Sequence, residues 1–150
     1  MFTHILVATD GSAHASAALE QAIDIARTQK ARLTLACVWQ SYWNWAGLPP
    51  AAPLDQDLLE RFRSHAREVL QAAAARVPTS VPVDTRLLEG APADAILREL
   101  DRGDYDLVAM GSRGRGDMGS LLLGSVSHHV LHRGRVPTLI IRRPEEAKPS

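Results

Sequence analysis

The segment Ile5-Leu6-Val7-Ala8-Thr9-Asp10-Gly11-Ser12 indicates the fold class, because four consecutive apolar residues lead directly into a polar turn that contains glycine. A short strand with no polar alternation is typical of a parallel sheet whose two faces are both covered by helices. The segment that follows, residues 13–29, repeats apolar side chains at helical spacing, at Ala18, Ala22, Ile25 and Ala26. The chain therefore begins as a buried strand followed by a helix.

The same alternation continues along the rest of the chain. Apolar, β-leaning segments predict strands at residues 3–8, 32–38, 82–88, 105–110 and 136–141. Helical patterns separate them at residues 13–29, 54–76, 92–100 and 125–133. Pro82 suits a strand start or an edge strand, and Pro92 suits the first turn of a helix. Five strands separated by four helices predict an α/β fold with an open, mostly parallel sheet and helices on both faces.

Length and composition limit the possible partners. The 150 residues match one ordinary domain, residues 1–150, and we expect residues 144–150 to form a flexible tail. The 17 basic and 17 acidic side chains cancel, so the charge does not favour wide binding to nucleic acid or to a membrane. No apolar run approaches the roughly 20 residues that span a bilayer.

The same features predict where the protein works. A single cysteine, Cys37, lies within an apolar run, which favours a reducing compartment and a buried strand position. The start of the chain, Met1-Phe2-Thr3-His4, leads straight into a strand and shows no targeting pattern. We therefore expect a soluble, cytoplasmic protein.

Two clusters of small residues near the C-terminus carry the main functional signal. Gly111-Ser112-Arg113-Gly114 closes an apolar strand pattern, and Gly124-Ser125-Val126-Ser127 opens a helical stretch after a nine-residue gap. Glycine lets the backbone approach an anion closely, and the free N–H groups in the first turn of a helix point at negative charge. The spacing G-x2-G-x9-G-S therefore predicts a cradle for a phosphate chain. The alternative is a flexible loop in which Ser125 only caps its helix.

A second loop is expected to meet this one. Ligands of open parallel sheets bind beyond the carboxyl ends of the strands, where the strand order reverses. Asp10 follows the first strand and Gly111 follows the fourth, so both residues lie at that edge if the two strands are neighbours. Asp10 could also be only a turn residue. Residues 39–53 contain Trp39, Trp43 and Trp45 and leave the second strand on the same side, where they could fold over the crevice as a lid.

Nearly end to end, the chain resembles the universal stress protein family, from Ile5-Leu6-Val7-Ala8-Thr9-Asp10-Gly11-Ser12 to Thr138-Leu139-Ile140-Ile141-Arg142. Gly111-x2-Gly114-x9-Gly124-Ser125 looks like the ATP-binding signature of the nucleotide-binding branch of that family. The resemblance implies a Rossmann-like, five-stranded parallel sheet with strand order 3-2-1-4-5. It also implies a homodimer through the last strand, Val136-Pro137-Thr138-Leu139-Ile140-Ile141, which would be an exposed apolar edge in a monomer.

The resemblance also implies a set of residues that contact ATP. It places the nucleoside against Ala8, Thr9 and Asp10, and the adenine base against Val38. It implies that the ribose and phosphates are lined by Met110, Gly111, Arg113 and Gly114. It gives the donors to the phosphate chain as Gly124, Ser125, Val126 and Ser127. A divalent ion, Mg²⁺ or Mn²⁺, commonly accompanies such a chain and bridges phosphate oxygens while keeping several waters, so a dedicated carboxylate cage is not needed.

Three functions are consistent with these features. The leading hypothesis is a nucleotide-dependent stress-response or signalling module that holds ATP. A slow ATPase or phosphotransferase is the alternative from another class, but neither Asp10 nor His128 has a context that makes it a base or a water-positioning residue. The third is a protein-interaction module with a vestigial pocket. The phosphate cradle does not distinguish ATP from ADP, AMP or a cyclic nucleotide.

Other candidate sites are weaker. Ser12, Ser125 and Ser127 lie near helix starts, but no recognisable motif places a histidine and a carboxylate beside them, so we expect no catalytic residue. His128 and His132 are four residues apart on one helix face, and no third ligand is spaced to join them in a metal site.

Overall fold

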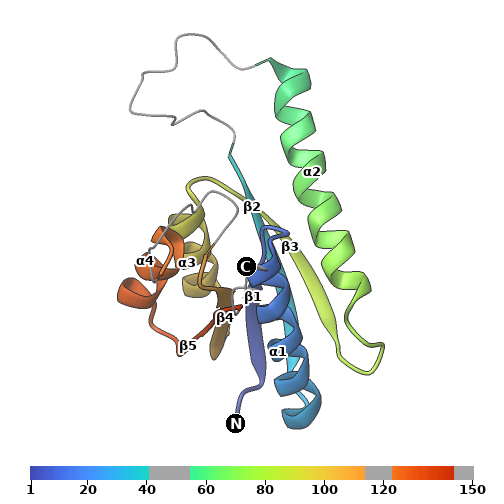
Figure 1. The fold of residues 1–150 in the computed structure, drawn as a ribbon, viewed down its shortest axis with the longest axis vertical. Coiled ribbons are helices and arrows are strands. Elements are labelled where there is room, and N and C mark those ends of the chain that lie inside the picture. Colours follow the sequence, from blue (N-terminus) through green and yellow to red (C-terminus); the bar gives the residue numbers. More distant parts are fainter. Residues whose placement is uncertain (41–54, 114–122, 144–150) are drawn as a thin grey trace, which may run out of the picture.

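The computed structural model describes residues 1–40, 55–113 and 123–143. These residues form one parallel sheet with strand order β3-β2-β1-β4-β5, together with helices on both faces (Figure 1). In chain order the elements are β1 (His4–Ala8), α1 (Ala13–Gln29), β2 (Arg32–Trp39), α2 (Gln56–Ala75), β3 (Val83–Glu89), α3 (Pro92–Arg102), β4 (Leu107–Gly111), α4 (Ser125–Arg133) and β5 (Thr138–Ile141). The predicted α/β fold and the strand order are confirmed.

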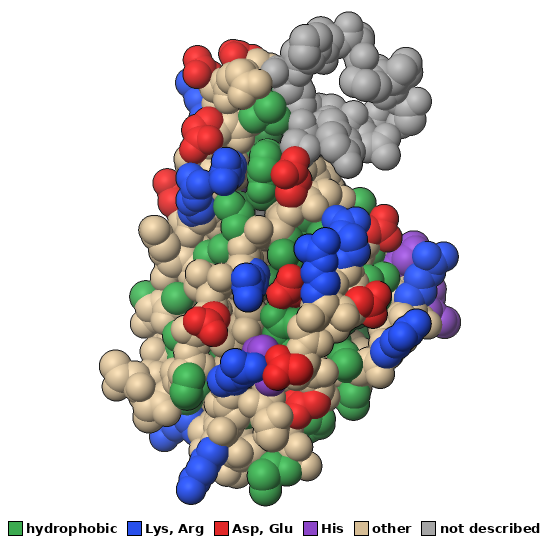
Figure 2. Space-filling model, turned by 180° about the vertical axis from the view of Figure 1, so that it is seen from behind, with side chains coloured by type: hydrophobic (Ala, Val, Ile, Leu, Met, Phe, Trp, Pro, Cys, Tyr) green, Lys and Arg blue, Asp and Glu red, His purple; other side chains and the backbone are tan. Residues whose placement is uncertain are grey.

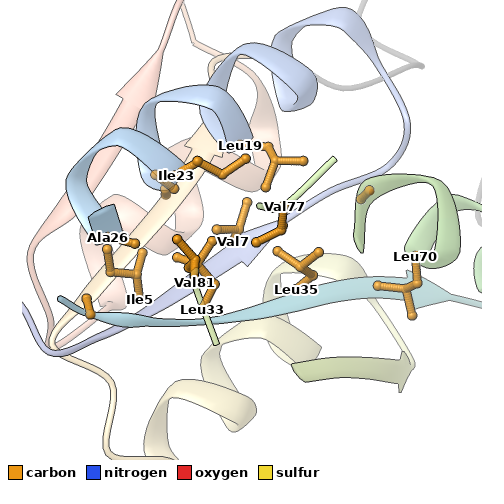
Figure 3. Packing of buried hydrophobic residues seen from close by; sticks show 14 of the residues in the cluster. Ile5, Val7, Leu19, Ile23, Ala26, Leu33, Leu35, Leu70, Val77 and Val81 are labelled. Atoms are coloured by element: carbon orange, nitrogen blue, oxygen red, sulfur yellow. The ribbon is translucent and has the colours of Figure 1, made fainter. Parts of the chain in front are cut away.

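The sheet separates two apolar clusters, which explains why β1 is apolar without alternation. Ile5 and Val7 pack with side chains of α1 and α2, as Figure 3 shows. Leu6 and Ala8 point to the opposite face, where α3 and α4 supply residues such as Ile96. Every residue of β1 is buried, because successive side chains enter different layers.

Local side-chain chemistry sets the helix ends. Ser12 caps α1, since its Oγ accepts a hydrogen bond from the Ala15 N–H at 3.2 Å. Asp55 caps α2 in the same way by accepting from the Asp57 N–H at 3.2 Å, so this helix begins at Gln56 rather than at the predicted residue 54. Pro92 occupies the first turn of α3, as predicted.

The strand ends differ from the prediction by one or two residues. β2 includes Trp39, which we expected in the irregular segment, because Trp39 pairs with Glu89 of β3. β5 begins at Thr138 rather than at residue 136, and its predecessor Pro137 has no N–H to donate to a ladder. Trp43, Trp45 and the predicted tail at residues 144–150 lie outside the described residues.

The distribution of charges on the surface and the hydropathy of the helices both agree with what the sequence predicts. On the face shown in Figure 2, basic and acidic side chains are interspersed rather than gathered by sign. Among the helices in the described ranges, none is long and apolar enough to cross a membrane.

Candidate nucleotide site

β1 and β4 are neighbours in the sheet, which brings the two predicted loops together. The strands pair in parallel register, with Ile5 opposite Leu107 and Val7 opposite Ala109. A pocket of about 450 Å³ lies at the carboxyl ends of these strands and of β2. It is on the face of the sheet that α3 and α4 cover. This is the edge where ligands of open parallel sheets bind.

Most of the predicted site residues line this one pocket. They are Ala8, Thr9, Asp10, Val38, Met110, Gly111, Arg113, Ser125, Val126 and Ser127. Gly124 lies directly before the last three as the N-cap of α4. Gly114 lies outside the described residues. The structure therefore brings the described members of the predicted set to one place in the fold.

Five further residues that line the pocket were not predicted from the sequence. They are Ala15, Ala36, Gln40, Pro92 and Ile96. Strand periodicity could have indicated Ala36, which is two residues before Val38 and so faces the same side of β2. Pro92 and Ile96 are one helical turn apart on α3, and no local pattern connects that helix with the glycine motif.

The turn between β1 and α1 holds Asp10 in a defined position. The Asp10 Oδ1 accepts a hydrogen bond from the Ser12 N–H at 2.8 Å, and the Thr9 Oγ1 accepts from the Gly11 N–H at 3.3 Å. Gly11 has φ of 80°, in the left-handed region that favours glycine. Asp10 therefore has the turn role considered as its alternative and also lines the pocket.

Gly111 is required by the packing of α1, independently of any ligand. A Cβ at this position would lie 2.7 Å from the backbone carbonyl carbon of His14 and 2.9 Å from the backbone nitrogen of Ala15. These atoms belong to the first turn of α1 and cannot move alone. The first glycine of the motif thus lets α1 approach the end of β4, where the pocket begins.

α4 presents its N-terminus to the pocket without a side-chain cap. Its N-cap is Gly124 rather than Ser125, and no side chain there accepts a hydrogen bond from the first turn. The interpretation of Ser125 as the helix cap is therefore wrong. Backbone N–H groups of an uncapped first turn, together with the helix dipole, form a site that favours an anion.

Two hydrogen bonds fasten α4 to the end of β4. The buried Ser127 Oγ donates to the Gly111 carbonyl oxygen at 2.7 Å, and the Gly124 N–H donates to the Ser112 carbonyl oxygen at 2.6 Å. The Ser127 hydroxyl thus has a structural bond, which the expected role as a phosphate donor did not include. Because of these bonds, the start of α4 is held in a fixed position beside the glycine loop.

Few of the described residues that line the pocket are charged. Among the described lining residues, Arg113 is the one cation and Asp10 the one carboxylate. In the described ranges, no group of three or more His, Cys, Asp or Glu side chains is arranged to hold a metal ion. On α4, the rings of His128 and His132 lie 4.4 Å apart.

A second polar cluster lies at the opposite, amino edge of the sheet. The His4 Nδ1 is 2.9 Å from the Asp104 Oδ1, and the His4 Nε2 is 2.8 Å from the Thr34 Oγ1. This order of carboxylate, imidazole and hydroxyl resembles a catalytic triad. However, Thr34 is only 3% exposed, so its hydroxyl cannot meet a substrate. We interpret the cluster as part of the fold.

The neighbours of His4 complete that cluster. Tyr105 packs against the His4 ring at 4.3 Å between centroids, and its hydroxyl donates to the Glu99 Oε1 at 2.6 Å. Burial, followed by this hydrogen bond, raises the pKa of Tyr105 to about 12. The hydrogen bond from His4 lowers the pKa of Asp104, and the Arg32 guanidinium, at 3.1 Å, acts in the same direction.

Comparison with known proteins places the chain in a family. A sequence model of the universal stress protein family matches residues 1–142. The chain belongs to this family. A universal stress protein encoded in the QAH/OAS sulfhydrylase 3′ region of Thermus aquaticus is 38% identical over 143 residues, which cover 95% of this chain and all of that protein.

Solved structures of the family share the fold. UspA from Lactobacillus plantarum superposes with a TM-score of 0.76 and 26% identity, over 93% of this chain and 97% of that one. A universal stress protein solved in complex with cAMP gives a TM-score of 0.68 and 27% identity, over the same shares of the two chains. Membership of the family thus rests on both sequence and structure.

Proposed function

We propose that the pocket binds ATP and that the protein acts as a nucleotide-dependent stress-response module. The observation that carries the proposal is the uncapped N-terminus of α4, which opens into a pocket lined by residues of three strand ends. A relative 27% identical to this chain was solved with cAMP, which supports an adenine nucleotide as the ligand. The buried Cys37 and the family membership favour the cytoplasm as its location.

The pocket is polar at one end and apolar at the other, as a nucleotide is. Arg113 and the first turn of α4 supply a positive charge and N–H donors at the end beside β4. The walls contributed by β2 and α3 are apolar, from Ala36, Val38, Pro92 and Ile96. A phosphate chain suits the first end and a flat base suits the second. The volume of about 450 Å³ is within the usual range for small-molecule sites.

Thr9 and Asp10 follow β1, which lies between β2 and β4 in the sheet, so they are placed between these two ends. Their oxygens can accept hydrogen bonds from ribose hydroxyls. With Asp10 as the one carboxylate among the described lining residues, an Mg²⁺ or Mn²⁺ ion would be held chiefly by phosphate oxygens and water. Such an ion would neutralise the charge of the phosphates.

The described lining residues favour binding of the nucleotide without its rapid hydrolysis. No histidine is among the described lining residues, and the Asp10 carboxylate is engaged with the Ser12 N–H at 2.8 Å. Hydrolysis needs a group that positions or deprotonates the attacking water. We therefore infer that ATP turnover is slow at most and that the bound nucleotide acts as a signal.

We further propose a homodimer through residues 136–141. β5 is an edge strand of the sheet, and its residues Thr138–Ile141 are each half-buried. Leu139 and Ile140 pack against the two core clusters, one on each face of the sheet. A second copy of the chain would cover the unpaired edge of this strand.

The test of ATP binding begins with the purified protein. Denaturation followed by chromatography and mass analysis identifies any nucleotide that it carries, and the emptied protein is then titrated with ATP and Mg²⁺ by calorimetry. Val38→Trp should fill the base end and abolish binding. Leu88→Trp is a matched control, because Leu88 pairs with Val38 across β2 and β3 and packs on the same cluster without lining the pocket.

Each outcome distinguishes the hypotheses. Binding that survives in Leu88→Trp and is lost in Val38→Trp supports the proposal. An emptied wild-type protein that does not bind ATP contradicts it and favours the interaction module with a vestigial pocket. Rapid appearance of ADP during the titration would contradict the inference that turnover is slow.

A further inference from the structure

The apolar end of the pocket contains one side chain with polar atoms. Ala36 and Val38 of β2 and Pro92 and Ile96 of α3 are apolar, and Gln40 lines the pocket beside them. Every other polar side chain among the described lining residues belongs to the loops after β1 and β4 or to α4. Gln40, an exposed residue that directly follows β2, is therefore the one polar side chain that the described lining has on the β2 and α3 side, where we expect the base.

The end of β2 holds Gln40 in register with the pocket. Trp39 is the last residue of the strand, and its carbonyl oxygen accepts a hydrogen bond from the Gly90 N–H at 3.1 Å. Side chains two residues apart in an extended chain point to the same face. Ala36, Val38 and Gln40 follow this spacing, and each of them lines the pocket.

The chemistry of an amide matches the edge of adenine. The Gln40 side chain offers an N–H donor and a carbonyl acceptor side by side. Adenine presents an exocyclic amino group beside a ring nitrogen that accepts, so an amide can form two hydrogen bonds with it. We propose that the Gln40 amide pairs with the edge of the bound base and thereby sets the preference for adenine. This inference rests on the proposed function.

Gln40→Glu is the most direct test. A carboxylate only accepts hydrogen bonds, so it pairs with the adenine amino group but repels the neighbouring ring nitrogen. The same carboxylate can accept from both N–H groups on the edge of guanine. The ratio of GTP affinity to ATP affinity should therefore rise by about tenfold, as expected for the loss or gain of a two-bond base contact.

Two further variants serve as comparisons. Gln40→Met keeps the size but has no comparable donor or acceptor, so ATP affinity should fall without a gain for GTP. Gln71→Glu makes the same charge change at an exposed position on α2, outside the pocket, and should leave both affinities unchanged. Binding of ATP and GTP to each protein is measured by calorimetry in the presence of Mg²⁺.

The results separate this inference from the proposed function. If the wild-type protein binds ATP and Gln40→Glu keeps the wild-type ratio of the two affinities, Gln40 does not contact the base and the inference is overturned. If the wild-type protein binds neither ATP nor GTP, the proposed function fails first and the inference fails with it. If the ratio of GTP affinity to ATP affinity rises in Gln40→Glu and in neither of the other two variants, the result supports both the proposed function and this inference.

Discussion

The two edges of the sheet treat polar groups in opposite ways. At the amino edge, the His4 ring is hydrogen-bonded to Thr34 at 2.8 Å and to Asp104 at 2.9 Å. At the carboxyl edge, α4 has Gly124 as its N-cap and therefore no side-chain cap, next to a pocket of about 450 Å³. Polar side chains that are bonded to one another, among them the buried His4 and Thr34, thus stabilise one edge, whereas backbone donors without a side-chain cap at the other edge can bind a ligand.

A substitution at Gly111 tests whether the fold also depends on residues at the carboxyl edge of the sheet. Gly111→Ala should lower the free energy of unfolding by about 3 kcal/mol, because the added Cβ would meet the backbone of α1. Gly124→Ala, at a φ of −66°, should cost less than about 1 kcal/mol. Urea denaturation measures both. Equal costs for the two variants would show that the close approach of α1 to Gly111 is unimportant.

A substitution at His4 tests whether the polar cluster at the amino edge stabilises the fold. His4→Ala should destabilise the fold by about 2 to 3 kcal/mol, because it leaves a cavity and removes a partner from the buried Thr34 hydroxyl. His129→Ala, which removes an exposed imidazole on α4, should change stability by less than about 0.5 kcal/mol. ATP affinity of His4→Ala at a temperature where it is folded should stay within about twofold of wild type, since His4 does not line the pocket. A large loss of affinity would mean that the two edges are coupled.

Tyr105 makes stability depend on alkaline pH. Its pKa is raised to about 12 in the folded protein, so its contribution is fully present below about pH 10, the value for a free tyrosine. This contribution is lost as the pH rises from 10 toward 12, by about 2 kcal/mol in total. Denaturation curves of wild type and Tyr105→Phe at a series of pH values isolate the effect. An identical pH slope in the two proteins would contradict it.

Arg113 gives the smallest expected effect. Arg113→Gln should weaken ATP binding by about fivefold, or about 1 kcal/mol, because it removes the one cation among the described lining residues while the N–H donors of α4 remain. Arg61→Gln on α2 removes the same charge outside the pocket and should leave affinity unchanged. Calorimetry at two salt concentrations provides the comparison. Equal weakening by both variants would indicate a general charge effect rather than a local contact.

The fold was predictable because its signals are local. The apolar run of β1 and the helical spacing of α1 indicate a buried parallel strand and its covering helix without any knowledge of the rest. The element ends were less predictable, since the start of α2 depends on a cap by Asp55 and the end of β2 on pairing with β3. The strand order itself came from the family resemblance.

The candidate site was predictable where its residues form a motif. Gly111, Gly124 and Ser125 are found from their spacing, and Asp10 from its place after the first strand. Ile96 could not be found in this way, because it joins the pocket only once α3 packs on the sheet, whereas Gln40 could have been indicated by its spacing of two residues from Val38.

The amino-edge cluster was missed for the same reason as Ile96. His4 lies 30 residues from Thr34 and 100 residues from Asp104 along the chain. No sequence motif links residues at such separations, so only the pairing of the strands brings them together.

An NMR titration of the emptied protein with ATP and Mg²⁺ tests directly which edge of the sheet binds the ligand, because every backbone amide reports on its own surroundings. We predict that the amide signals of Asp10, Gly111 and Ser125 shift strongly, while those of His4 and Tyr105 at the opposite edge do not shift. Shifts confined to the amino edge, or no shifts at saturating ATP, would contradict the claim that the carboxyl edge of the sheet is the ligand-binding edge.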